Sequence, residues 1–161
     1  MRLAYAVGGA IAARGWRLVY GGGRVGLMGA LAQGAIDAGG AVTGVIPEAL
    51  LTREKADDDD MKLEVVSDMA VRKTRMIALS DAFLALPGGL GTLDELFEVL
   101  TLRQIGYHGK PVAVLDHEGY WGAMLRMCDD MVQAGFLAPN HREMLVVTAD
   151  PQGLLDAVAP V

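Results

Sequence analysis

Cysteine is almost absent from this sequence of 161 residues, and no uninterrupted apolar run reaches the length of a membrane span. The one cysteine, Cys128, has no partner for an internal disulfide and no neighbouring thiols for a metal site. No charged segment followed by an apolar stretch marks a secretion signal. The chain has only 14 basic residues against 20 acidic ones, and the resulting net charge of −6 argues against non-specific nucleic-acid binding. We therefore expect a cytoplasmic protein that binds neither nucleic acid nor membrane.

Several common catalytic and metal-binding motifs are also missing. The sequence has no nucleophile elbow, no Cys–His pair and no Walker A lysine-serine motif. His108, His117 and His141 each lack a metal-ligand partner at short spacing. The four aspartates at residues 57–60 lack the glycine and the terminal glutamate of an EF-hand calcium loop. The sequence thus predicts neither a bound metal nor a cofactor.

Apolar residues, in contrast, are abundant: they make up 52% of the chain, and the mean hydropathy is +0.31. The length suits a single domain over residues 1–161. Continuous apolar segments of strand length alternate with segments of helical periodicity, a pattern typical of parallel strands covered on both faces. We predict an α/β fold with a doubly wound, mostly parallel sheet and helices on both faces. Ligands in such folds bind at the carboxyl ends of the strands.

The individual elements follow from this alternation. The predicted strands span residues 16–20, 41–46, 63–66, 81–86, 112–115 and 144–147. The predicted helices span residues 5–14, 27–38, 68–79, 120–133, a segment from the glycine turn at 87–91 to about 105, and a short segment after Asp150. Residues 48–60 are predicted to form a polar loop.

One glycine-rich turn, residues 87–95, lies between a predicted strand and a predicted helix. Three glycines at one bend let the backbone approach a ligand closely, because no Cβ stands in the way. The N-terminus of the following helix favours an anion such as phosphate. A structural explanation competes with this one, because Thr92 and Glu95 match a capping box. The stretch alone favours the capping box slightly.

A second glycine cluster, formed by Gly21, Gly23 and Gly26, matches the dinucleotide fingerprint between a strand and a helix. The chain before it begins with a helix, and no acidic residue ends the next strand. An NAD site therefore has little support. We interpret the cluster as a loop that lines a nucleotide or permits tight packing.

Arg72 occupies an unusual position in the predicted helix 68–79. It falls in line with Met69 and Met76 at helical spacing, on an otherwise apolar face. Such an arginine either extends into solvent or is held in a pocket for an anion or a polar ligand. Lys73 and Arg75 would widen the positive patch.

Six groups of residues occur in an order typical of one family. They are residues 20–23 (YGGG), 26–29 (GLMG), 44–47 (GVIP), 69–76 (M-x-x-R-K-x-x-M), 87–95 (PGG-x-GT-x-x-E) and 104–111 (QIG-x-H-x-KP). Over nearly its whole length, the chain resembles the LONELY GUY family of cytokinin riboside 5′-monophosphate phosphoribohydrolases, often mislabelled lysine decarboxylases. The resemblance implies hydrolysis of the N-glycosidic bond of an N6-modified adenosine 5′-monophosphate, which releases the cytokinin or adenine base and ribose 5-phosphate.

The resemblance also implies the site residues. Arg72 and Glu95 match the family's catalytic pair. The residues that match its substrate-binding positions are Glu54, Lys73, Gly88, Gly89, Gly91, Thr92, Asp94 and Thr101. An AMP-like nucleotide is the implied substrate, and a homodimer with the site near the subunit interface is the implied assembly.

The chemistry of the implied pair can be argued physically. Cleavage of a glycosidic bond builds positive charge on the ribose. Glu95 can stabilise that charge, hold the ribose hydroxyls or activate water. Arg72 does not titrate near neutral pH, so we assign it charge stabilisation and the orientation of phosphate, water or the leaving base.

The chain also departs from the family pattern. The family's first strand, with its Cys-Gly-Ser-Ser-like loop, is missing, so we expect a fold that lacks this strand. Ala70 and Leu102 replace a histidine and a tryptophan of the family, which leaves the preferred base open. An alternative from another functional class is a non-catalytic carrier of a nucleotide or of molybdenum cofactor, which would bind its ligand without turnover.

Overall fold

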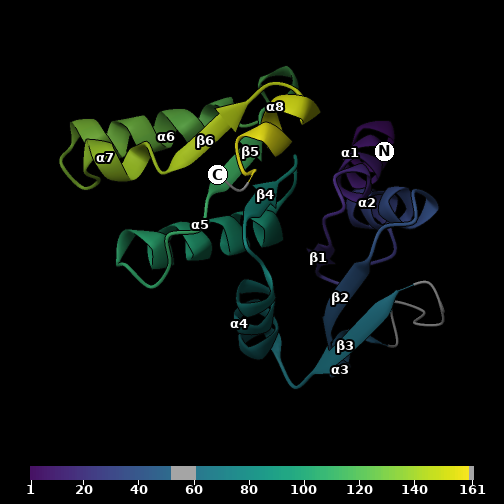
Figure 1. Ribbon diagram of the computed structural model, residues 1–161. Helices are drawn as coiled ribbons and strands as arrows, with labels where there is room; N and C mark the ends of the chain where they lie inside the picture. Colours follow the sequence, from purple (N-terminus) through teal and green to yellow (C-terminus); the bar gives the residue numbers. More distant parts are fainter. Residues whose placement is uncertain (52–60, 160–161) are drawn as a thin grey trace. The chain divides into compact units, whose positions relative to one another are not determined.

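The protein is described by a computed structural model that covers residues 1–51 and 61–159 (Figure 1). Contacts divide the chain into two compact units, Met1–Ser80 and Asp81–Val161. The described strands form two three-stranded parallel sheets, one in each unit. The predicted α/β class, with parallel strands and flanking helices, is confirmed.

The first unit contains strands β1 (Leu18–Tyr20), β2 (Val42–Pro47) and β3 (Lys62–Val66), paired in the order β1-β2-β3. Its helices are α1 (Arg2–Ala13), α2 (Gly26–Asp37), α3 (Glu48–Leu51) and α4 (Met69–Leu79). All six residues of the central strand β2 are buried, as the continuous apolar run predicts for a strand covered on both faces.

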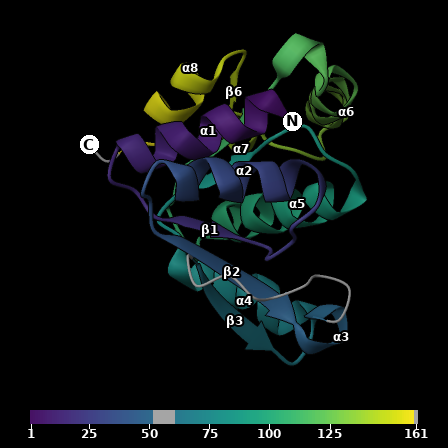
Figure 2. The same cartoon turned by 90° about the vertical axis from the view of Figure 1, so that its right-hand side faces the viewer.

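Helices α1 and α2 lie side by side in this unit (Figure 2). Glycines permit the close approach: a Cβ on Gly8 would overlap the carbonyl oxygen of Leu31, and one on Gly34 would overlap the carbonyl oxygen of Tyr5. The hydroxyl of Tyr5 also donates to Asp37 Oδ2 over 2.6 Å. The high glycine content of this region therefore serves helix packing.

The second unit contains strands β4 (Phe83–Ala85), β5 (Val112–Leu115) and β6 (Leu145–Thr148), paired in the order β4-β5-β6. Its helices are α5 (Leu90–Gln104), α6 (Gly122–Gln133), α7 (Pro139–Arg142) and α8 (Pro151–Asp156), with a 3-10 turn, η1 (His117–Gly119). All four residues of β5 have zero exposure. Among the described strands, β1 and β3 are the edge strands of the first sheet and β4 and β6 those of the second, each with one partner.

Aspartates cap two of the described helices. The side chain of Asp68 accepts a hydrogen bond from the Val71 amide (2.9 Å) at the start of α4, and Asp150 accepts one from Gly153 (2.9 Å) at the start of α8. Each of these side chains satisfies a backbone amide that has no partner within its own helix.

One local prediction was wrong. Residues 48–51 form the short helix α3, although a polar loop was expected for 48–60. Of the two explanations of the glycine turn, the capping box at Thr92 is not formed, because α5 begins at Leu90 with Gly89 as its N-cap. Thr92 therefore lies inside the first helical turn. The helix begins earlier because Gly89 takes the extended conformation of an N-cap residue (φ −95°, ψ −154°) without a capping side chain.

Candidate functional site

Arg72 is held inside the first unit and does not extend into solvent. Its side chain projects from α4 and is only 6% exposed. The Nε atom donates a hydrogen bond to the backbone carbonyl of Val45 in β2 (3.1 Å). The guanidinium fills the space beside Gly21, where a Cβ would overlap it. Of the two alternatives left open by the sequence, the structure excludes extension of Arg72 into solvent.

This contact explains part of the dinucleotide-like glycine cluster. Gly21 leaves room for the Arg72 guanidinium, and Gly22 has a positive φ of 78° with the side chain of Ile46 close to the place where a Cβ would stand. Glycine adopts such a conformation without steric cost. Close packing thus accounts for the glycines at these two positions, as the packing interpretation predicts.

The other predicted residues of this unit differ from Arg72 in their surroundings. Lys73 is half-buried on α4. Arg75 forms a two-pronged contact with Glu64 (2.6 and 3.2 Å), and Lys62 lies 2.9 Å from the same carboxylate. The hydrogen bonds from Arg75 and Lys62 lower the pKa of Glu64 to about 2. The prediction that Arg75 widens a positive patch was wrong, because Glu64 neutralises it. Glu54 lies outside the described residues.

In the second unit, the glycine turn joins β4 to α5. A Cβ on Gly88 would overlap Thr92 Oγ1, so packing within the turn itself requires this glycine. Apart from adjacent residues and the backbone of α5 itself, no described heavy atom lies within 4 Å of the place where a Cβ would stand on Gly89 or Gly91, and neither has a positive φ. The protein's own packing therefore does not require glycine at 89 and 91.

The amide groups at the start of α5 lie beside this open space. The bond from Leu93 N–H to the Gly89 carbonyl (3.1 Å) is the first of the helix, so the amides of residues 90–92 precede it. Such amides, together with the partial positive charge of a helix N-terminus, attract anions. The turn can therefore bind a phosphate through its backbone, with Gly89 and Gly91 allowing close approach.

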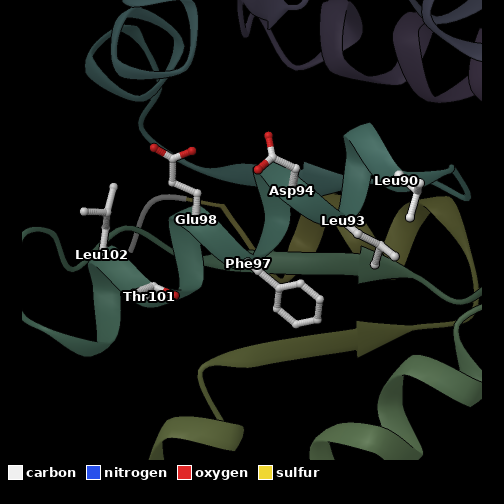
Figure 3. A pocket seen from close by; sticks show the side chains of 7 residues that line it. All are labelled: Leu90, Leu93, Asp94, Phe97, Glu98, Thr101 and Leu102. Carbon is white, nitrogen blue, oxygen red and sulfur yellow. The ribbon is translucent and has the colours of Figure 1, made fainter. Parts of the chain in front are cut away.

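Further along α5, Asp94 and Thr101 line a pocket of about 550 Å³ (Figure 3). Its lining residues are Leu90, Leu93, Asp94, Phe97, Glu98, Thr101 and Leu102. The carboxylates of Asp94 and Glu98 point to the same side of the helix (Figure 3). Glu98 was not predicted as a site residue, although its position four residues after Asp94 places both side chains on one helical face. Glu95 is half-buried and does not line this pocket.

Neither a metal cluster nor a membrane span is found in the described parts of the chain. No three His, Cys, Asp or Glu side chains of residues 1–51 and 61–159 are grouped so that they could hold a metal ion. No helix in these ranges combines the length and the apolar character needed to cross a bilayer.

Comparison with known proteins identifies the family. The family described as "Possible lysine decarboxylase" matches residues 28–158. A probable cytokinin riboside 5′-monophosphate phosphoribohydrolase of Oryza sativa subsp. japonica is 47% identical over 146 residues, which cover 91% of this chain and 69% of that protein. The chain belongs to the LONELY GUY family. The resemblance carried by the six sequence motifs is thereby confirmed.

Other LONELY GUY relatives and a solved structure extend the comparison. A cytokinin riboside 5′-monophosphate phosphoribohydrolase of Mycobacterium tuberculosis is 44% identical over 160 residues, 99% of this chain and 86% of that protein. The molybdenum cofactor carrier protein of Chlamydomonas reinhardtii has a similar structure, with a TM-score of 0.72 and 26% identity, covering 98% of this chain and 84% of that one. The LONELY GUY chain therefore has the fold of a carrier protein, and its sequence is nearer to the phosphoribohydrolases.

Proposed function

We propose that this protein hydrolyses the N-glycosidic bond of an N6-modified adenosine 5′-monophosphate, or of AMP itself, and releases the base and ribose 5-phosphate. One structural observation carries the proposal: Gly89 and Gly91 face open space at the N-terminus of α5, where no packing demand explains them. Membership of a family whose relatives are named phosphoribohydrolases supports the choice of reaction.

In this proposal, the turn binds the 5′-phosphate. A phosphate needs several hydrogen-bond donors, and the amides at the start of α5 supply them without a lysine or a metal. Gly88, Gly89 and Gly91 bring the backbone close, and the hydroxyl of Thr92 adds a donor within the first turn of α5. Asp94 and Thr101, which share the pocket on α5, contact the rest of the nucleotide.

Glu95 and Arg72 act on the reacting bond. As the glycosidic bond breaks, positive charge develops on the ribose, and the Glu95 carboxylate stabilises it or activates the attacking water. Arg72 stays charged throughout, so it orients and stabilises negative charge without transferring a proton. Its burial and its bond to Val45 hold the guanidinium in one orientation, which is what an orienting group needs. Lys73 and Glu54 are proposed to contact the substrate.

We extend the proposal to the assembly and the compartment. Residues 1–161 are proposed to act as a single nucleotide-binding domain in a cytoplasmic homodimer, with the site near the subunit interface. Neither metal nor cofactor takes part in the proposed reaction.

A carrier function is the second candidate, and one observation favours it: the structural similarity to the molybdenum cofactor carrier protein of Chlamydomonas reinhardtii. A carrier and a hydrolase on one fold both bind a ligand. They differ in turnover, because a carrier releases its ligand unchanged.

Chromatographic product analysis separates the two candidates. We expect the protein to release adenine from AMP and isopentenyladenine from isopentenyladenosine monophosphate. Glu95→Gln and Arg72→Ala should each lower the rate about a hundredfold or more. Arg75→Ala is the matched control, since it removes the same charge from the same helix at a residue paired with Glu64. Full turnover in both site variants would contradict the assigned roles, and binding of AMP without base release would support the carrier.

A further inference from the structure

A tyrosine outside the predicted site contacts the glycine turn. The hydroxyl of Tyr120 donates a hydrogen bond to the carbonyl oxygen of Gly88 over 2.7 Å and joins residues 32 positions apart. Tyr120 is 53% exposed, so burial of its ring does not by itself explain this placement. None of the family motifs found in the sequence contains this residue.

The backbone before Tyr120 is fixed in an unusual conformation. Glu118 has a φ of 55° and is the only residue other than glycine with a positive φ in the described chain; Gly119 follows with 74°. A residue with a Cβ adopts this region only against a steric penalty. Such a turn persists when the structure around it holds it in place.

That support is visible on both sides of the turn. Asp116, at the end of β5, receives a 2.6 Å hydrogen bond on Oδ1 from the Trp121 amide, and its own amide donates to the Thr148 carbonyl (2.8 Å). Trp121 is only 3% exposed, and its ring meets that of Tyr120 edge-on at 5.0 Å. The hydrogen bonds of Asp116 and the contact with the buried Trp121 ring therefore hold Tyr120 in place.

At the other end of the bond, Gly88 is restrained twice. Thr92 Oγ1 fills the side where a Cβ would stand, and Tyr120 binds the carbonyl. In a trans peptide, the carbonyl and the following N–H point in opposite directions. Restraint of the Gly88 carbonyl therefore directs the N–H of Gly89 away from Tyr120. Two adjacent glycines are otherwise free to rotate this peptide.

We infer that Tyr120 is a positioning residue, whose hydroxyl holds the Gly88–Gly89 peptide so that the Gly89 N–H faces the 5′-phosphate of the nucleotide. This inference rests on the proposed function. Without the hydroxyl, the peptide is free to turn its carbonyl oxygen toward the phosphate, which exchanges a donor for a repulsive acceptor. Tyr120 thus acts on phosphate affinity, and it contacts neither the base nor the glycosidic bond.

The test replaces Tyr120 by phenylalanine in the full chain. Tyr120→Phe keeps the ring and its contact with Trp121 and removes only the hydroxyl. We expect the KM for AMP to rise about three- to tenfold, the effect of one lost hydrogen bond, with kcat little changed. Inhibition by ribose 5-phosphate should weaken by the same factor, while inhibition by adenine stays as in the wild type. Tyr107→Phe is the matched control, because Tyr107 lies in the same unit and is 79% exposed; we expect no change.

The two inhibitors separate a positioning role from a general loss of structure. Both inhibition constants come from one preparation, so their ratio does not depend on the folded fraction. Equal weakening of both inhibitors in Tyr120→Phe would overturn the inference. If the wild type releases adenine, an unchanged KM together with unchanged inhibition by ribose 5-phosphate in Tyr120→Phe would overturn it as well. A wild type that releases no adenine from AMP would overturn the proposed function, and this inference with it.

Discussion

Glycine has different roles in the two units of this protein. In Met1–Ser80, a Cβ on Gly8 or Gly34 would overlap a backbone carbonyl, and one on Gly21 would overlap the Arg72 guanidinium. In Asp81–Val161, a Cβ on Gly89 or Gly91 would meet no described heavy atom within 4 Å, apart from adjacent residues and the backbone of α5 itself. The first unit thus requires Gly8, Gly21 and Gly34 for its own packing, whereas the packing of the second unit does not require Gly89 or Gly91.

This difference indicates how each unit positions its proposed functional groups. The first unit surrounds Arg72 with backbone, so the position of the guanidinium depends on the surrounding fold. The second unit leaves backbone amides at the start of α5 beside open space, so their partner has to come from outside this turn. Substitutions of Gly8, Gly21 or Gly34 should therefore act through structure, and substitutions of Gly89 or Gly91 through ligand binding.

The largest effect is expected for Gly21→Ala. The added methyl group would overlap the Arg72 guanidinium, which is the far end of a flexible side chain and is therefore the group expected to move. A displacement of about 1 Å in an orienting group lowers turnover about a hundredfold. The measurement is kcat for base release, with a thermal melt of the same preparation. Wild-type turnover would show that the position of Arg72 does not matter to the reaction.

Gly8→Ala should have the next largest effect, on stability. The methyl group would collide with the Leu31 carbonyl of the neighbouring helix, so α1 and α2 have to separate. We expect the free energy of unfolding to fall by about 1–3 kcal/mol, as in overpacked cores. Urea titration measures it.

Gly9→Ala provides the control within the same helix. Its Cβ would lie 3.5 Å from the Gly34 carbonyl oxygen, an ordinary contact. Alanine favours the helix by about 0.5–1 kcal/mol over glycine, and this gain is common to both variants. The difference between Gly8→Ala and Gly9→Ala therefore isolates the packing requirement. Equal stabilities would contradict it.

Gly91→Ala is expected to separate stability from binding. Its methyl group meets open space in the first turn of α5, so the free energy of unfolding should stay constant or rise by up to about 1 kcal/mol. The same methyl group would stand between the backbone and the phosphate, and the KM for AMP should rise about tenfold. Gly109→Ala is the matched control, since Gly109 also faces open space in this unit, away from the turn. An unchanged KM would argue against a phosphate at Gly91.

Much of the fold was predictable because each element has a local signal. The buried strands β2 and β5 are continuous apolar runs, and the caps Asp68 and Asp150 stand directly before their helices. The start of α5 in the glycine turn was predicted, but its capping was open because two local signals overlap: Thr92 and Glu95 fit a capping box, whereas the extended conformation of Gly89 begins the helix before Thr92.

The site was less predictable because its contacts join distant parts of the chain. An arginine on an apolar helical face is compatible with exposure and with burial. The contact with Gly21 and the bond to Val45 decide between them, and helical periodicity reports neither. The bond from Tyr120 to Gly88 has no local pattern at all. It forms because β4 and β5 pair side by side, which brings the turn after β5 close to the turn after β4.

The two units should also respond to acid at different pH values, the smallest effect that we expect. In the second unit, His108 Nε2 bonds the Val99 carbonyl (3.0 Å), and Nδ1 accepts from the Lys110 amide (3.2 Å), which requires a neutral ring. Burial lowers the pKa of His108 below its ordinary value of 6.5. The unfolded chain then binds the proton more readily, so stability is complete above pH 6.5 and falls as the pH drops below it.

In the first unit, the corresponding group is Glu64, whose pKa Arg75 and Lys62 lower from 4.5 to about 2. Its contribution to the free energy of unfolding is complete above pH 4.5 and is lost as the pH falls toward about 2.

The two tryptophans allow the units to be followed separately, because Trp16 lies in the first and Trp121 in the second. Urea midpoints from Trp16→Phe, which reports the second unit, should begin to fall near pH 6.5. Those from Trp121→Phe should hold until about pH 4.5. His108→Gln should remove the earlier fall, and midpoints that decline together in both variants would show that the units do not titrate independently.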